Sequence, residues 1–337
     1  MNNIIAVENL TKIYNGQVKA VDNISFSVKE GEVFGFLGPN GAGKTTTIKV
    51  LTTLLRKTSG KAFVSSHEVD HNPMAIRRII GYTAQDIEID GDMTGRENLV
   101  LAGRLYRLPR KKVKERTEEL LEVMGLTDAA GRLAGTYSGG MRKRLDLATV
   151  LVHEPQVLFL DEPTTGLDPQ SRFALWQYLE KINKEGATIF LTTQYMEEAD
   201  RLCQKLAIID LGKIVAEGEP KKLKAEIGGD TVTIEIKGEV ETAKNYQAEA
   251  RAALEKVTDV SAVKPLDDNR VVLYVKNGGL VIPEIISLLN NLNIPLGPLS
   301  FSESTLDDVF LKYTGRELRV EEEKRKSRMQ KIMRGRT

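Results

Sequence analysis

The sequence predicts an α/β fold: a largely parallel sheet covered by helices, a helical insert, and a small α+β domain after them. Three observations support this. Up to about Ile227, β-branched runs alternate with amphipathic segments, as in "GEVFGFLG" followed by "GKTTTIKVLTTLL". Between Asp86 and Val152 the strand pattern stops, and apolar residues recur at three- and four-residue spacing. After the two glycines of "EIGGD" a second pattern of strands and helices begins.

These patterns divide the chain into three parts. Residues 1–227 form the α/β domain, in which the helical insert takes up about residues 86–152. Residues 228–314 predict a small α+β domain with the order β-α-β-β-α-β. Residues 315–337 form a charged tail with nine basic and four acidic residues, which predicts either a solvated helix or a contact with anionic lipid or a partner.

Composition and charge argue against several protein classes. Forty-eight Lys and Arg against 47 Asp and Glu give a net charge of +1, so bulk charge does not favour nucleic-acid binding. No run approaches the roughly 20 apolar residues of a membrane span, and "MNNIIAVENLTKIY" lacks the features of a signal peptide. The single Cys203 rules out an intramolecular disulfide and fits a reducing compartment. We therefore expect a protein that is neither secreted nor embedded in a membrane.

The stretch "GPNGAGKT" fits the phosphate-loop pattern G-x-x-x-x-G-K-[ST] and lies between an apolar strand and a helix, the context that the pattern requires. Its glycines allow backbone N–H groups to face phosphates, its lysine neutralises phosphate oxygens, and its threonine offers a hydroxyl to Mg²⁺. The sequence thus predicts a nucleoside triphosphate bound with magnesium. The residues expected at the phosphates are Gly38, Pro39, Asn40, Gly41, Ala42, Gly43, Lys44, Thr45 and Thr46.

A second motif, "VLFLDEP", places two acids at the end of an apolar strand, where open α/β sheets bind their ligands. We expect Asp161 to hold Mg²⁺ together with Thr45, and Glu162 to orient or deprotonate the attacking water. With Lys44, Glu162 is a candidate catalytic residue.

The third motif, "YSGGMRKRLDLA", begins a predicted helix. Ser138 suits the N-cap, and Gly139 and Gly140 leave N–H groups exposed at the positive helix end, which predicts a second anion site. The guanine-reading pattern Asn-Lys-x-Asp of GTPases is absent from the chain.

With these motifs in this order, residues 1–227 resemble the ATP-binding cassette family. The resemblance implies that ATP is bound between two antiparallel copies, with the phosphate loop of one facing the Ser138–Gly140 stretch of the other. It also implies three further contacts. Tyr14 in "LTKIYNG" would stack on adenine, Gln85 in "GYTAQD" would contact Mg²⁺ and water, and Asp168 in "TTGLDP" would lie in the loop that crosses the dimer interface.

The sequence also resembles a subfamily, the ATPases of drug-resistance exporters of the daunorubicin type, in "YSGGM", "LTTQYMEEADRL" and "STLDDVFLKYTG". This resemblance implies export of a drug-like or lipophilic compound through a separate membrane subunit, which would dock near Ile87–Leu105 and hold the ATPase at the cytoplasmic face of the membrane. Gln194 stands where most cassette ATPases carry a histidine, so we expect a catalytic residue that contacts the γ-phosphate and does not titrate.

Two alternatives remain. One is a soluble cassette ATPase that acts on nucleic acid or ribosomes. About 100 residues separate Gly38 from Ser138, which leaves no room for the long coiled coil of the chromosomal type, and the chain has one cassette where translation-type members usually have two. The other is an import ATPase, which the C-terminal domain and Gln194 disfavour.

Overall fold

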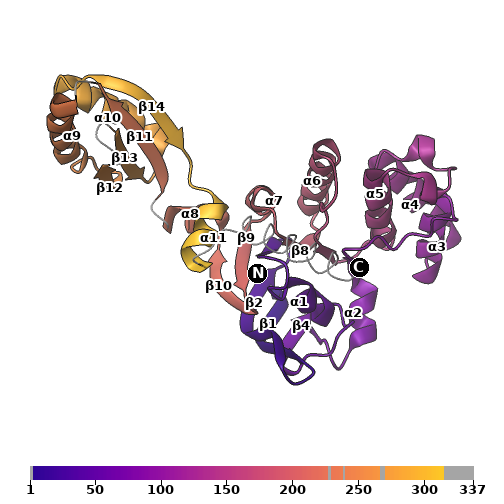
Figure 1. Cartoon of the computed structure of the whole chain (residues 1–337). Helices are drawn as coiled ribbons and strands as arrows, with labels where there is room; N and C mark the ends of the chain where they lie inside the picture. The colour runs from indigo at the N-terminus through magenta and orange to yellow at the C-terminus, as the bar shows by residue number, and fades with distance from the viewer. Residues whose placement is uncertain (1–2, 227–228, 238–239, 266–269, 315–337) are drawn as a thin grey trace, which may run out of the picture. The chain divides into compact units, whose positions relative to one another are not determined.

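The computed structural model describes residues 3–226, 229–237, 240–265 and 270–314, which fall into two compact units (Figure 1). The second unit begins at Pro220, earlier than the boundary at residue 227 taken from the sequence. The reason is that helix α8 (Pro220–Glu226) packs against α11 (Leu306–Thr314), where the Lys312 ammonium donates to the Glu226 carbonyl oxygen at 2.8 Å. The tail predicted over 315–337 lies outside the described residues.

The first unit contains a six-stranded sheet in the order β10-β9-β3-β8-β7-β6. Every pair in it is parallel except the edge pair of β9 and β10. Strands β3, β7 and β8 are buried along their whole length, which explains why most of their residues are apolar. The predicted parallel sheet is confirmed, and its strands are β3 (Val33–Leu37), β6 (Ile80–Thr83), β7 (Val157–Asp161), β8 (Thr188–Thr193), β9 (Lys205–Asp210) and β10 (Lys213–Gly218).

A second, antiparallel sheet has the order β2-β1-β4-β5, and the alternation of strands and helices did not predict it. Its strands are β1 (Asn3–Tyr14), β2 (Val18–Lys29), β4 (Ser59–Val64) and β5 (His67–Glu68). The core includes the buried faces of both sheets and helix α1 (Lys44–Leu51). A cluster of five phenylalanine rings joins β2, β3, β7 and β8: Phe26, Phe34, Phe36, Phe159 and Phe190.

The helical insert is confirmed. It consists of α3 (Gly95–Leu105), α4 (Arg110–Val123) and α5 (Gly139–Leu151), which lie together in Figure 1, with two short 3₁₀ turns between α4 and α5. Thr94 and Glu97 form a capping box that starts α3. The other helices of the unit are α2 (Pro73–Ile79), α6 (Pro169–Lys184) and α7 (Met196–Leu202).

The second unit has the predicted β-α-β-β-α-β order, followed by α11. Its antiparallel sheet is ordered β12-β13-β11-β14, and one face packs on the apolar sides of α9 and α10. The elements are β11 (Asp230–Ile236), α9 (Val240–Leu254), β12 (Val260–Pro265), β13 (Arg270–Val275), α10 (Gly278–Asn291) and β14 (Leu296–Ser302). In the described part of the chain, none of the helices has the length and apolar character needed to cross a bilayer.

Candidate nucleotide site

The order of the parallel strands brings the predicted motifs to one edge of the sheet. Strands β3, β8, β7 and β6 are consecutive neighbours, so their carboxyl ends lie side by side. The residues that follow these ends are Gly38, Gln194, Glu162 and Gln85. A hydrogen bond from the Gly38 N–H to the Thr193 carbonyl oxygen, at 3.2 Å, ties the ends of β3 and β8 together.

The phosphate loop over residues 38–43 has a backbone that needs glycine. Gly41 and Gly43 have φ angles of 87° and 110°, in the left-handed region. A Cβ at Gly38 would lie 2.2 Å from the Ile209 carbonyl oxygen, and one at Gly43 would lie 2.4 Å from the Ala20 carbonyl oxygen. The loop leads directly into α1, whose positive N-terminal end favours bound anions.

The side chain of Lys44 is buried within the loop. Its ammonium donates to the carbonyl oxygens of Gly38 at 2.7 Å and Pro39 at 3.2 Å. It also pairs with Glu162 Oε1 at 3.1 Å, and both side chains are about 95% buried. The predicted catalytic lysine and the predicted base are therefore in direct contact.

Asp161 lies beside the hydroxyl of Thr45, as expected for a shared magnesium site. Thr45 Oγ1 donates to Asp161 Oδ1 at 3.1 Å, and Thr192 Oγ1 donates to the same oxygen at 2.6 Å. The other carboxylate oxygen, Oδ2, is buried and has no hydrogen-bond partner among the described residues. Mg²⁺ prefers oxygen ligands, and the Thr45 hydroxyl and the unpartnered Asp161 Oδ2 are two such oxygens. The sequence did not indicate a role for Thr192, because a single threonine within a mainly apolar strand forms no recognisable motif.

Glu162 is held in a left-handed backbone conformation, with φ of 51°. Its N–H donates to the carbonyl and hydroxyl oxygens of Thr192, both at 3.1 Å. Its second carboxylate oxygen accepts from Gln85 Nε2 at 3.5 Å and from Thr165 Oγ1 at 3.4 Å. The turn after β7 thus aims this carboxylate at Lys44 and Gln85, which joins three of the predicted residues.

Gln194 lies at the end of β8, next to the start of the phosphate loop. Its Oε1 atom is buried and has no hydrogen-bond partner in the part of the chain that the structure describes. An amide oxygen in that position is available to a group from a ligand or a second chain.

The stretch Ser138–Gly140 lies at the start of α5, and its contacts within the described ranges are to α5 and α6, not to the phosphate loop of the same chain. Ser138 caps α5 as predicted, with its hydroxyl accepting from the Met141 N–H at 3.2 Å. A Cβ at Gly140 would lie 2.6 Å from Ser171 Oγ at the start of α6. Asp168 caps α6, accepting from the Ser171 N–H and hydroxyl at 2.9 and 2.6 Å, and these bonds lower its pKa.

Tyr14 ends β1, and its side chain is 37% exposed. The Lys12 ammonium lies 5.2 Å from the ring centroid. An exposed ring leaves area for a stacked base.

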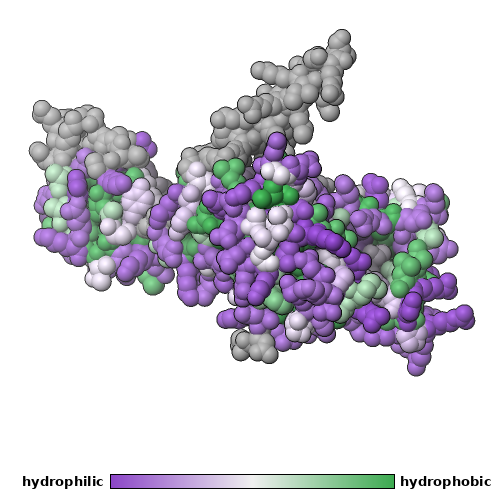
Figure 2. All heavy atoms as spheres, turned by 90° about the horizontal axis from the view of Figure 1, so that it is seen from below, coloured by the Kyte–Doolittle hydropathy of each residue, from purple (hydrophilic) through white to green (hydrophobic). Residues whose placement is uncertain are grey.

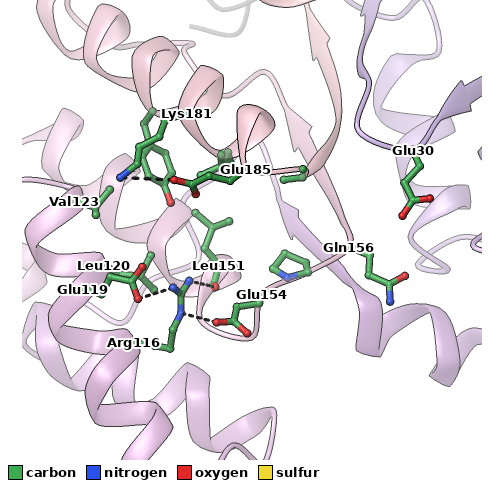
Figure 3. A pocket seen from close by; sticks show the side chains of 15 residues that line it. Glu30, Arg116, Glu119, Leu120, Val123, Leu151, Glu154, Gln156, Lys181 and Glu185 are labelled. Carbon is green, nitrogen blue, oxygen red and sulfur yellow. Dashed lines mark hydrogen bonds and ion pairs between the residues drawn. The ribbon is translucent and has the colours of Figure 1, made fainter.

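A separate cavity of about 430 Å³ lies at the opposite edge of the sheet, since Gln156 and Ala187 precede β7 and β8 (Figure 3). Arg116 pairs there with Glu119 at 2.7 Å and donates to the Leu151 carbonyl oxygen at 3.0 Å. None of the predicted site residues lines it. We therefore assign nucleotide binding to the carboxyl edge.

Comparisons with known proteins agree with this geometry. The family model described as "ABC transporter" matches residues 21–165, and the one described as "ATP-binding protein DrrA1-3-like, C-terminal domain" matches residues 218–314. The chain is 41% identical over 315 residues to the daunorubicin/doxorubicin resistance ATP-binding protein DrrA of Streptomyces peucetius, covering 92% of each. It is 36% identical over 316 residues to the linearmycin resistance ATP-binding protein LnrL of Bacillus subtilis, covering 94% of this chain and all of that protein.

Among solved structures, the chain resembles an ATP-binding cassette in a dimeric, post-hydrolysis state bound to ADP and Pi. The TM-score is 0.59 at 26% sequence identity, over 64% of this chain and 98% of the other. Both units and the motif order therefore have counterparts in known transporter subunits. The chain belongs to the ATP-binding cassette family, among the ATP-binding subunits of the daunorubicin-resistance type, and it is an ATPase that powers transport.

Proposed function

We propose that this ATPase drives export of a drug-like or lipophilic compound through a separate membrane subunit, from the cytoplasmic face of the membrane. The observation that carries the proposal is the similarity to resistance proteins along nearly the whole chain, including the C-terminal unit. No similarity of this kind supports the alternative, a cassette ATPase that acts on nucleic acid or ribosomes. The net charge of +1 does not favour binding to nucleic acid either.

ATP would be bound by two copies of the chain. The phosphate loop, Asp161 and Glu162 lie together in one copy, whereas Gly140 is buried close to Ser171 of α6 and Ser138 and Gly139 are exposed at the start of α5, where the positive helix end would favour an anion. The similarity to a dimeric cassette bound to ADP and Pi supports a site completed by a second copy. Adenine would stack on Tyr14, and the loop of Asp168 would lie at the interface.

Magnesium would be held by Thr45 and Asp161, with Gln85 in contact through its amide. When bound, it would neutralise phosphate charge and orient the reacting groups. The unpartnered Asp161 Oδ2 supports this donor set.

The buried ion pair suggests how binding and hydrolysis are linked. A phosphate oxygen in the loop competes with Glu162 for the Lys44 ammonium, because the ammonium is the cationic group of the loop. Once Lys44 binds phosphate, Glu162 is free to accept a proton from water. Gln194 then holds the γ-phosphate through its amide.

The membrane subunit would dock on the segment Ile87–Leu105. Three apolar side chains at the end of α3 support this: Leu101, Leu105 and Tyr106 are 39%, 73% and 39% exposed. The loop before α3 is already ordered, since the buried Asn98 amide donates to the Asp90 carbonyl oxygen at 3.0 Å and Asn98 Oδ1 accepts from the Asp90 N–H at 2.9 Å. Figure 2 shows a mainly hydrophilic surface with small hydrophobic patches, and a group of exposed apolar side chains at one helix end is a candidate interface.

The proposal is tested by expressing the chain together with the membrane protein encoded beside it. Cells should accumulate less daunorubicin than cells carrying the Glu162→Gln variant with the same membrane protein. Equal accumulation of daunorubicin and of other lipophilic antibiotics would contradict the export of drug-like compounds.

A further inference from the structure

Two charged side chains of α5 are buried against the segment that carries Gln85. Lys143 and Asp146 lie one helical turn apart and are 5% and 4% exposed. Burying a charge is unfavourable unless partners compensate for lost hydration. Their location therefore calls for a physical reason.

Both side chains contact the backbone of residues 84–88. Lys143 Nζ donates to the carbonyl oxygens of Ala84 at 3.1 Å and Gln85 at 3.5 Å. Asp146 Oδ1 accepts from the Glu88 N–H at 3.2 Å. The lysine thus holds one end of this five-residue segment and the aspartate the other.

The sheet does not hold the segment, because the paired residues of β6 end at Thr83. A loop of this kind is free to move unless side chains fix it. Gln85 extends from it to Glu162, at 3.5 Å. The geometry therefore makes the position of Gln85 depend on α5.

Arg144, the residue after Lys143 in this helix turn, makes a different contact. Its Nη1 atom donates to the Met124 carbonyl oxygen at 2.6 Å, just after α4. Arg144 ties α5 into the helical insert, whereas Lys143 ties α5 to the Gln85 segment. Two adjacent cations on one helix thus provide a variant and its matched control.

We propose that Lys143 and Asp146 are positioning residues for ATP hydrolysis, which fix segment 84–88 to α5 so that Gln85 and the Ser138–Gly140 stretch move as one unit. This inference rests on the role of Gln85 given under the proposed function. Gln85 would then shift relative to Glu162 when α5 moves as Ser138–Gly140 binds a nucleotide. It would shift in the same way when the membrane subunit moves the segment Ile87–Leu105.

A double-mutant cycle on the full-length protein tests this inference. At saturating ATP and Mg²⁺, Lys143→Met should lower kcat about tenfold and leave the KM for ATP within about twofold, because the phosphate loop is unchanged. In a Gln85→Ala background, the same substitution should have no further effect, because Lys143 acts through Gln85. An equal fall in both backgrounds would show an independent structural role and overturn the proposal.

Arg144→Met is the control and should leave kcat unchanged. If Lys143→Met does not fold, Lys143→Gln, which keeps an N–H donor, replaces it in the cycle with a smaller loss in the wild-type background only. If Gln85→Ala alone leaves kcat unchanged, the assigned role of Gln85 is wrong and the positioning role fails with it. If Gln85→Ala lowers kcat but the cycle is additive, only the positioning role is wrong.

Hydrogen exchange gives a readout that does not depend on activity. Asp146→Val should speed exchange of the Glu88 amide about fivefold or more, since that amide loses its acceptor. Asp146→Asn keeps an acceptor oxygen and should largely restore protection, and Arg144→Met should not change it. Unchanged exchange in Asp146→Val would contradict the contact on which the proposal depends.

Discussion

The Lys44 ammonium lies 3.1 Å from Glu162 Oε1, and both side chains are almost fully buried. Each is therefore the main charge partner of the other in a region of low dielectric constant. Under the proposed function, a phosphate bound in the loop competes with Glu162 for the Lys44 ammonium, which also donates to the Gly38 and Pro39 carbonyl oxygens. The proposed function therefore links nucleotide binding to the release of Glu162 from this ion pair.

Replacing Glu162 by glutamine should stabilise an ATP-bound dimer. The substitution removes the base and the competitor for Lys44 but keeps the shape of the side chain. Size-exclusion chromatography with ATP and Mg²⁺ should show a dimer that persists, while the wild-type protein returns to monomer as ATP is consumed. Lys44→Ala is the control, since it should bind ATP poorly and remain monomeric. A Glu162→Gln variant that stays monomeric at saturating ATP would contradict a site shared between two copies.

Replacing Gln194 by alanine should reduce kcat about tenfold or more, the usual effect of losing one transition-state contact. Gln194→His should keep substantial activity, because a neutral imidazole also offers a donor and an acceptor. The wild-type pH profile of kcat should show no titration near pH 6.5 from this position, whereas the histidine variant acquires one.

The neighbouring Tyr195 provides the control for that experiment. Its ring lies 4.8 Å from the Arg172 guanidinium, and Tyr195→Phe keeps the ring. Tyr195→Phe should hydrolyse ATP at the wild-type rate. If Gln194→Ala does so as well, Gln194 has no part in the reaction.

Introducing a charge at Leu105 should weaken association with the membrane subunit. Leu105→Glu places a carboxylate in the expected interface, and losing one buried leucine contact corresponds to about a tenfold or greater loss of affinity. Basal ATP hydrolysis should be unchanged, because the Leu105 side chain is 73% exposed and its replacement leaves the packing of the insert intact. Co-purification with the membrane subunit is the measurement, and Leu133→Glu, also exposed in the insert but outside the segment, is the control.

Deleting residues 319–337 should weaken membrane attachment only slightly when the membrane subunit is present, because docking on that subunit, and not contact of the basic tail with anionic lipid, is expected to supply the attachment. Release of the protein by this deletion alone would contradict docking through Ile87–Leu105.

The stability of the first unit should depend on the ionisation of Asp146. Burial raises its pKa to about 6, above the usual value of 3.8. A raised carboxyl pKa favours the folded state while the group is protonated, so this contribution is complete below about pH 4 and is lost as pH rises through 6. The loss is on the order of 3 kcal/mol.

Asp146→Asn removes this titration and keeps an acceptor for the Glu88 N–H. The difference in melting temperature, variant minus wild type, should therefore rise between pH 4 and 6 and then level off. Differential scanning calorimetry across that range is the measurement, and a difference independent of pH would show that Asp146 keeps its ordinary ionisation.

Local patterns were sufficient for most elements. Strands β3, β7 and β8 are rich in apolar residues, and α3, α4 and α5 carry regular helical spacing, so each was predicted from its own residues. The antiparallel sheet was missed because β1 and β2 carry register shifts and polar residues within twelve-residue strands, which weakens a period-two pattern. Helix α8 belongs to the second unit because it packs on α11, which lies far from it in the sequence, so no local pattern assigns it.

The sequence by itself determined the chemistry of this protein, because a phosphate loop, an acidic strand end and a glycine-rich helix start each act through local geometry. The tertiary structure decided which of these groups meet. Lys44 with Glu162, Thr192 with Asp161, and Lys143 with the Gln85 segment are all contacts between residues far apart in the chain. They exist because the strand order puts β3, β8, β7 and β6 side by side and packs α5 on the end of β6, and no local pattern encodes that order.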